Sequence, residues 1–220
     1  MNQRTGDRLP VAVLWDMDGT LVDTEPLWMA AQAALAAECG VDWTVRDARG
    51  SVGKAMPLTA RLLQHRGVHG TVEEIVDRLV ERVVADITPT VPWLPGAVSL
   101  LGELAAAGVR CALVTQAYSP VAHRVAAAAP AGALTAVVAG DDVSQGKPHP
   151  EPYLRAAELL GVDPNHCVAI EDSPNGTLSA EAAGAAVIVV RGMVPVPAAP
   201  GRRHVASLHE VTLATIKQMD

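Results

Sequence analysis

Residues 11–20 read VAVLWDMDGT, a continuous apolar run that ends in two aspartates and a glycine. Apolar residues without alternation are typical of a strand buried on both faces of a parallel sheet. Asp16 and Asp18, two positions apart in an extended chain, point the same way. Ligands of open parallel sheets bind beyond the carboxyl ends of the strands, so a site is expected at this pair. Asp and Gly are also common turn residues, and a solvated turn is the alternative.

Four further apolar runs share the character of the first. Each is short and continuous, and they are Cys111–Thr115, Ala136–Ala139, Cys167–Ile170 and Ala186–Val190. Stretches with helical character lie before and between these runs, at Ala97–Ala107, Ser119–Ala129, Glu151–Leu160 and Asn175–Ala183. Strands and helices in alternation predict an α/β fold with a Rossmann-like parallel sheet as its core.

The alternation is interrupted once, between the first and the second predicted strand. This segment carries apolar residues at helical spacing, which predicts helices at Pro26–Cys39, Ala55–His65 and Val72–Ala85. A proline-rich return follows at residues 88–96. The sequence therefore predicts an α/β core formed by residues 1–23 and 92–220. An α-helical cap domain, residues 24–91, is expected as an insertion after the first strand.

The C-terminal part of the chain is less regular. Gly192–Arg203 is rich in proline and is predicted as a loop. His204–Leu208 is predicted as a last strand, and Leu208–Met219 as a closing helix.

The chain of 220 residues has a formal net charge of −7 and no basic block, which argues against binding to nucleic acid or an anionic membrane. Residues 1–10 lack the apolar segment of a signal peptide, and no stretch is long and apolar enough to span a bilayer. A cytoplasmic protein, monomeric or dimeric, is expected. Cys39, Cys111 and Cys167 show no C-x-x-C spacing, which favours small core side chains over a disulfide or a zinc site.

The later strands also end in residues that can do chemistry. Thr115 closes the second strand, Lys147 lies in a GKP sequence after the third, and Glu171 and Asp172 follow the fourth. Carboxylates bind Mg²⁺, and the metal and a lysine neutralise phosphoryl oxygens, so this set suits metal-assisted phosphoryl transfer. A solvated surface charge is the alternative for Lys147.

In their order and wording these motifs resemble the haloacid dehalogenase superfamily. They are most similar to its phosphoglucomutase-like and sugar-phosphatase-like members, which carry a helical cap after the first motif. The stretches that carry the resemblance are Asp16–Glu25, Gly146–Pro148 and Glu171–Gly176. The resemblance covers almost the whole chain, and it implies a Mg²⁺-dependent enzyme that acts on a small phosphorylated metabolite.

The resemblance also implies a role for each motif residue. Asp16 would be the nucleophile that forms an aspartyl-phosphate and would also ligate Mg²⁺, with a metal ligand alone as the alternative. Asp18 would be the general acid and base, with its backbone carbonyl on the metal. Its presence favours phosphate chemistry because the dehalogenase branch does not keep an aspartate there. Thr115 and Lys147 would bind the phosphoryl group, and Asp172 would ligate Mg²⁺.

Two neighbouring residues are expected to support this set. Glu171 lies beside Asp172 and would act as an indirect or outer ligand of the metal. Gln116 stands where this subgroup usually has asparagine. Its longer side chain would donate a hydrogen bond from a different point.

Glu25, Trp28 and Lys54 of the predicted cap are candidate substrate contacts, although Glu25 fits equally well as a helix-start acid. Related hexose-phosphate mutases have histidine where Trp28 stands, and that histidine helps to gate proton transfer by Asp18. Trp28 therefore favours a phosphatase. A phosphosugar mutase is the first alternative. A non-catalytic binding protein with the same fold is the second, and the complete set of motif residues argues against it.

Overall fold

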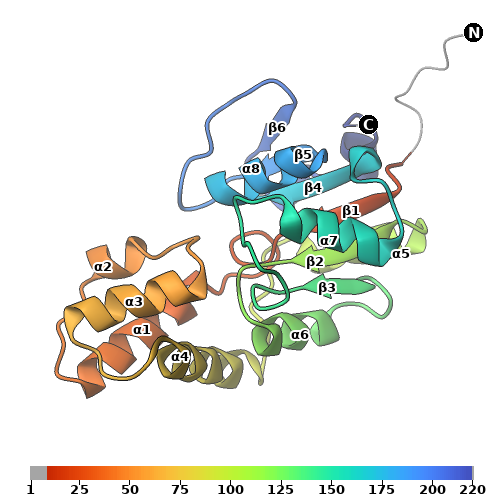
Figure 1. Cartoon of the computed structure of the whole chain (residues 1–220). Helices are drawn as coiled ribbons and strands as arrows, with labels where there is room; N and C mark the ends of the chain where they lie inside the picture. Colours follow the sequence, from red (N-terminus) through yellow and green to blue (C-terminus); the bar gives the residue numbers. More distant parts are fainter. Residues whose placement is uncertain (1–8, 220) are drawn as a thin grey trace, which may run out of the picture.

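The computed structural model describes residues 9–219 and shows an α/β architecture (Figure 1). Within these residues the sheet has six strands, all parallel, in the order β3-β2-β1-β4-β5-β6. The strands are β1 (Ala12–Trp15), β2 (Arg110–Val114), β3 (Ala136–Val138), β4 (Cys167–Glu171), β5 (Ala186–Val190) and β6 (Arg202–Val205). The five apolar runs are thus confirmed as strands, each within a residue of its predicted bounds. Most of the N-terminal segment predicted to hold no signal peptide lies outside the described residues.

Helices cover both faces of the sheet, because successive residues of a buried strand point to opposite sides. These helices are α5 (Ala97–Ala106), α6 (Ser119–Ala128), α7 (Glu151–Leu160) and α8 (Pro174–Ala183). Val13 and Trp15 of β1 belong to the hydrophobic core on the side of α5 and α6. Ala12 and Leu14 belong to the core on the side of α7 and α8. The first strand is therefore fixed from both faces, and it delivers Asp16 to the carboxyl edge of the sheet.

A group of four helices is inserted between β1 and β2 and lies beside the sheet, on the left in Figure 1. These helices are α1 (Glu25–Glu38), α2 (Val45–Arg49), α3 (Met56–Arg66) and α4 (Val72–Ile87). Helix α4 packs against α1 and α3 through one buried face that includes Ile75, Leu79 and Val83. The three predicted helices of this segment are confirmed. Helix α2 was not predicted, because it buries only Ala48 and so has no apolar period.

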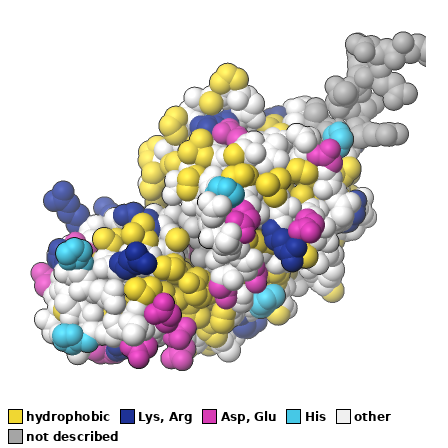
Figure 2. All heavy atoms as spheres, viewed as in Figure 1, with side chains coloured by type: hydrophobic (Ala, Val, Ile, Leu, Met, Phe, Trp, Pro, Cys, Tyr) yellow, Lys and Arg dark blue, Asp and Glu magenta, His cyan; other side chains and the backbone are white. Residues whose placement is uncertain are grey.

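Side chains of opposite charge are interspersed on the face seen in Figure 2, over both the sheet core and the helical group. Hydrophobic side chains gather on the same face where the helical group meets the core. Within residues 9–219, no helix combines the length and the apolar character that a membrane crossing requires.

The C-terminal predictions need correction. The last strand is Arg202–Val205 and not His204–Leu208, so the predicted loop ends at residue 201. This strand lies at the sheet edge and pairs only with β5, which is why its sequence is polar and lacks an apolar run. The predicted closing helix is shorter: a 3-10 turn at Leu208–Glu210 precedes α9 (Leu213–Lys217). Thr212 begins α9 by accepting a hydrogen bond from the Thr215 amide.

Candidate active site

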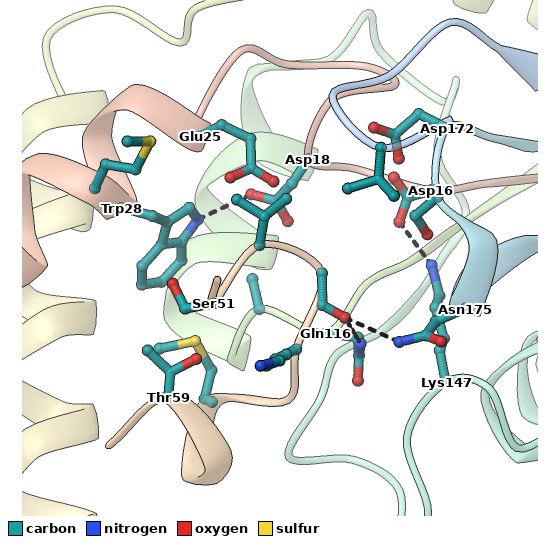
Figure 3. A pocket seen from close by; sticks show the side chains of 18 of the residues that line it. Asp16, Asp18, Glu25, Trp28, Ser51, Thr59, Gln116, Lys147, Asp172 and Asn175 are labelled. Atoms are coloured by element: carbon teal, nitrogen blue, oxygen red, sulfur yellow. Dashed lines mark hydrogen bonds and ion pairs between the residues drawn. The ribbon is translucent and has the colours of Figure 1, made fainter. Parts of the chain in front are cut away.

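A cavity of about 270 Å³ lies between the carboxyl edge of the sheet and helices α1 and α3, with the loop that precedes α3 (Figure 3). The residues predicted for the site that line it are Asp16, Asp18, Glu25, Trp28, Lys54, Gln116, Lys147 and Asp172. Thr115 and Glu171 lie directly behind this lining and are buried. Residues that are far apart in the sequence are thus brought together at one edge of the sheet, as the strand-end argument predicts.

Lys147 is buried in an acidic environment. Its ammonium group donates to Asp16 Oδ1 at 2.6 Å, to Glu171 Oε1 at 2.6 Å and to the Val114 carbonyl at 2.9 Å. Burial alone would lower the pKa of Lys147, but the charges of Asp16 and Glu171 outweigh it and raise the pKa above its ordinary value. The ring of Tyr153 lies 5.2 Å from the ammonium nitrogen. The alternative of a solvated surface charge is therefore excluded.

Asp16, Glu171 and Asp172 form a cluster in which carboxylate oxygens lie within 4.8 Å of one another. Burial, followed by the charge of Glu171, raises the pKa of Asp16 to about 7, although Lys147 opposes this. Burial, followed by the charge of Asp16, raises the pKa of Asp172 to about 9. When all three carboxylates are ionised, one ammonium leaves an excess of two negative charges. A divalent cation would balance that excess.

The free oxygens of the cluster show which residues fit a metal ion. Asp16 Oδ2 is buried and has no hydrogen-bond partner among residues 9–219. The Asp172 carboxylate occupies a slot beside Gly19 and Gly192, where added β-carbons would lie 2.3 and 2.4 Å from Asp172 Oδ2. Such a slot suits a hard cation with oxygen ligands, and Mg²⁺ is one.

Glu171 differs from the other two acids because both of its oxygens are occupied. Oε1 accepts from Lys147 and from the Tyr153 hydroxyl, the latter at 2.7 Å. Oε2 accepts from the Asp172 and Ser173 amides and from the Ser173 hydroxyl. Glu171 therefore orients Lys147 and the loop after β4. Tyr153 was missed in the sequence, where it reads as one more apolar residue of a predicted helix.

Asp18 is held by hydrogen bonds from both sides of the cavity. Its Oδ1 accepts from the Thr24 hydroxyl and from the Trp28 indole N–H, the latter at 2.9 Å. Its Oδ2 accepts from the Thr115 hydroxyl at 3.1 Å. Trp28 was expected at the substrate, and the structure adds this direct contact with Asp18. In this arrangement the Thr115 hydroxyl is directed at Asp18, and its binding of a phosphoryl group stays a prediction.

The helical side of the cavity contributes polar groups that the sequence did not single out. Gln32, Ser51 and Thr59 line the cavity, and Gln32 Oε1 accepts from the Ser51 hydroxyl at 3.0 Å. Gln32 is a polar residue within the alanine-rich first helix, which is the one sequence signal that could have marked it. Burial, followed by the charge of Asp18, raises the pKa of Glu25 to about 7. Lys54 is exposed and lies at the rim.

Gln116 does not turn toward the sheet-side acids. Its Nε2 donates to the Gly53 carbonyl of the helical group at 2.9 Å, and Asn175 Nδ2 points to the same oxygen at 3.4 Å. In this structure the Gln116 amide donates to the protein itself, and its donation to a bound phosphoryl group stays a prediction.

Buried aspartates and a lysine at the strand ends of a parallel α/β sheet define an enzyme of the phosphoryl-transfer class. Residues 11–184 match the family model of the haloacid dehalogenase-like hydrolases, and the chain belongs to this family. It is 34% identical over 186 residues to hexitol phosphatase A of Escherichia coli K12, with 84% of each chain covered. It is 32% identical to hexitol phosphatase B of the same strain, with 82% of this chain and 83% of the relative covered.

A solved structure supports the assignment to this family. CbbY from Rhodobacter sphaeroides, crystallised in complex with phosphate, superimposes with a TM-score of 0.81 at 31% identity. The match covers 92% of this chain and 96% of CbbY. With phosphatases among its relatives over most of its length, the chain is a phosphatase of the haloacid dehalogenase-like family.

Proposed function

We propose that this phosphatase hydrolyses a small phosphorylated metabolite, a sugar phosphate or a similar monoester, through an aspartyl-phosphate on Asp16 with Mg²⁺ bound. One observation carries the proposal: Lys147 holds one oxygen of the buried Asp16, while the other oxygen has no partner in the part of the chain that the structure describes. A carboxylate with one oriented and one free oxygen can ligate a metal and attack phosphorus at once.

The first chemical step transfers the phosphoryl group to the enzyme. The Asp16 oxygen beside Lys147 attacks phosphorus, and the bond between phosphorus and the leaving oxygen breaks. The Lys147 ammonium neutralises negative charge on the phosphoryl oxygens. Asp18 gives its proton to the leaving alkoxide, which departs as an alcohol, and Asp18 is left ionised.

The second step releases phosphate. A water molecule attacks the aspartyl-phosphate and loses its proton to Asp18, which returns to its protonated form. The bond between phosphorus and the Asp16 oxygen breaks, and the carboxylate is restored. Hydrogen bonds from Trp28 and Thr115 hold Asp18 in place between the two steps.

Asp16, Asp172 and the backbone carbonyl of Asp18 would hold Mg²⁺, which supplies positive charge against the phosphoryl group during transfer. Glu171 would support this metal site indirectly, by accepting hydrogen bonds from Lys147 and from the Asp172 amide. The charge balance of the cluster supports this assignment, because Mg²⁺ and Lys147 together offset its three carboxylates.

We propose that residues 24–91 act as a cap over a core formed by residues 1–23 and 92–220, and that the cap contacts the leaving group. Gln32, Thr59 and Lys54 offer polar atoms to the cavity. A cavity of about 270 Å³ suits an ester with a few polar carbons rather than a macromolecule. The curated hexitol phosphatase relatives support a polyhydroxylated leaving group.

Hydrolysis is preferred over a mutase reaction because of the chemistry of Trp28. The indole N–H donates to Asp18 and has no basic nitrogen, so it cannot accept or relay a proton. A mutase must keep water from its phosphoenzyme until a second sugar arrives. A fixed hydrogen-bond donor on Asp18 offers no means of switching between water and a second sugar as the acceptor of the phosphoryl group.

Phosphate release from a panel of sugar and polyol phosphates, with and without Mg²⁺, tests the proposal. The wild type should release phosphate only with Mg²⁺, and Asp16→Asn should lower the rate about 1,000-fold or more, because the nucleophile is lost. Asp86→Asn is the matched control, an exposed acid of α4 away from the cavity. Turnover by Asp16→Asn at the wild-type rate, or hexose 1-phosphate conversion to the 6-phosphate without phosphate release, would contradict the proposal.

A further inference from the structure

The carboxamide of Gln116 bridges the two sides of the cavity. Its nitrogen reaches the Gly53 carbonyl, where the Asn175 amide also arrives, and Figure 3 shows the two dashed lines meeting at this oxygen. Gln116 follows β2 and Asn175 lies in the first turn of α8, so both belong to the sheet edge. Gly53 belongs to the loop between α2 and α3 of the helical group.

The position of Gln116 is fixed by two glycines of the core. A β-carbon on Gly140 would lie 2.3 Å from the Gln116 backbone oxygen, and one on Gly146 would lie 2.8 Å from its side-chain oxygen. The side chain therefore fits a slot that larger residues would close. Asparagine in this slot would be shorter by one carbon, about 1.5 Å, and its nitrogen would stop beyond hydrogen-bonding distance of Gly53.

The loop that Gln116 holds forms one wall of the cavity. Ser51, Val52, Gly53 and Lys54 all line it. The backbone hydrogen bonds of this loop are local, to residues 46–51 of the same helical group. Among residues 9–219, the two amides on Gly53 are the hydrogen bonds that tie this loop to the sheet edge.

We propose that Gln116 is a positioning residue for substrate specificity: with Asn175 it holds loop 50–54 against the sheet edge and so sets the wall around the leaving group. The inference rests on the proposed phosphatase function and adds a determinant of its selectivity. Because Gln116 does not contact the acids or Lys147 by any hydrogen bond among the described residues, its loss should weaken binding of the leaving group and spare the chemical step.

Two variants distinguish the effect of the side-chain length from the effect of the amide donor. Gln116→Glu keeps the length but replaces the donor by an oxygen that faces the Gly53 carbonyl. Gln116→Asn keeps the amide but is too short to reach it. Gln64→Glu is the matched control, because Gln64 also donates to a glycine carbonyl, that of Gly70 at 2.8 Å, but away from the cavity.

The kinetic test compares sorbitol 6-phosphate, whose leaving group is a six-carbon polyol, with acetyl phosphate, whose leaving group is small. Gln116→Asn, which adds no charge to the cavity, should raise KM for sorbitol 6-phosphate about 3- to 10-fold, the factor that one ordinary hydrogen bond supplies. The kcat for this ester and the KM for acetyl phosphate should stay within about 2-fold of wild type. Equal losses with both esters, or an unchanged KM for sorbitol 6-phosphate, would overturn the proposal.

Hydrogen–deuterium exchange tests the tether without any turnover, so it also decides the proposal if no ester is hydrolysed. Peptides that cover loop 50–54 should exchange faster in Gln116→Glu and Gln116→Asn than in the wild type, while peptides of α4 should not change. Gln64→Glu should leave loop 50–54 at the wild-type rate. Identical exchange of loop 50–54 in the wild type and both Gln116 variants would show that the amide does not hold this loop.

Discussion

Raising the pH in the absence of Mg²⁺ should destabilise the folded protein, and Mg²⁺ should reverse the loss. The reason lies in the acidic cluster, where one lysine faces three buried carboxylates. The pKa of Asp16 is raised to about 7 and that of Asp172 to about 9, chiefly by burial. Without a metal ion, the folded protein therefore holds protons that the unfolded chain has released.

The sign and the size of the effect follow from these two values. Both folded pKa values lie above the ordinary aspartate value of 3.8, so the stabilisation is complete at acidic pH and is lost as the pH rises through 7 to 9. From about pH 6 to about pH 8, a group with a pKa of 7 weakens the fold by about 1.4 kcal/mol and one with a pKa of 9 by about 2.7 kcal/mol. The two together lower the free energy of unfolding by at most about 4 kcal/mol.

Urea unfolding in a chelator at both pH values measures the loss, and the same titration with millimolar Mg²⁺ measures its recovery. Mg²⁺ should stabilise the protein more at the higher pH, because at the lower pH it must displace protons from its ligands. Asp172→Asn is the internal control, because it removes the contribution of Asp172 and keeps every other titratable group of the chain. A wild-type stability that is constant or rises over this range would refute the reasoning, as would an equal pH dependence in Asp172→Asn.

Three further substitutions test single contacts. Lys147→Met should destabilise the fold by about 3–5 kcal/mol in urea and lower kcat at least about 100-fold, since it leaves buried carboxylates without their cation; wild-type stability would contradict this. Trp28→Phe keeps the ring but removes the donor to Asp18, so kcat for sugar phosphates should fall about 10-fold in steady-state assays, and an unchanged kcat would rule out a role for the hydrogen bond. Gly176→Ala places a β-carbon 1.7 Å from Glu171 Oε1 and should destabilise the protein by about 3 kcal/mol in thermal unfolding. Gly102→Ala, where the β-carbon meets nothing, should not destabilise it.

The sequence predicted the sheet and the strand-end residues because both depend on short-range patterns. A strand buried on both faces is apolar along most of its length, and β1 and β5 show this pattern without interruption. The parallel order then places Asp16, Lys147 and Asp172 at one edge, whatever the details of packing. The bounds of the edge strand β6 were predicted wrongly, because an edge strand needs no continuous apolar run.

Contacts across the cavity could not be predicted from the sequence, because they depend on how the helical group sits on the core. The Trp28 indole reaches Asp18 only because the first turn of α1 lies directly after the strand-end loop. Gln116 was noticed as a departure from asparagine, but its partner Gly53 lies 63 residues away. Neither the distance nor the partner is encoded in a local pattern.

These cross-cavity contacts suggest how one fold combines a constant reaction with a variable leaving group. The groups proposed to act on phosphorus are fixed by the sheet: Lys147 is bound to Asp16, which follows β1, and to Glu171, which ends β4. The proposed general acid is different, since Asp18 receives hydrogen bonds from Thr115 of the core and from Trp28 of the helical group. In the proposed mechanism, proton delivery to the leaving oxygen therefore depends on the position of the helical group. An ester that leaves the helical group poorly positioned should react slowly, even when its phosphoryl group is well bound.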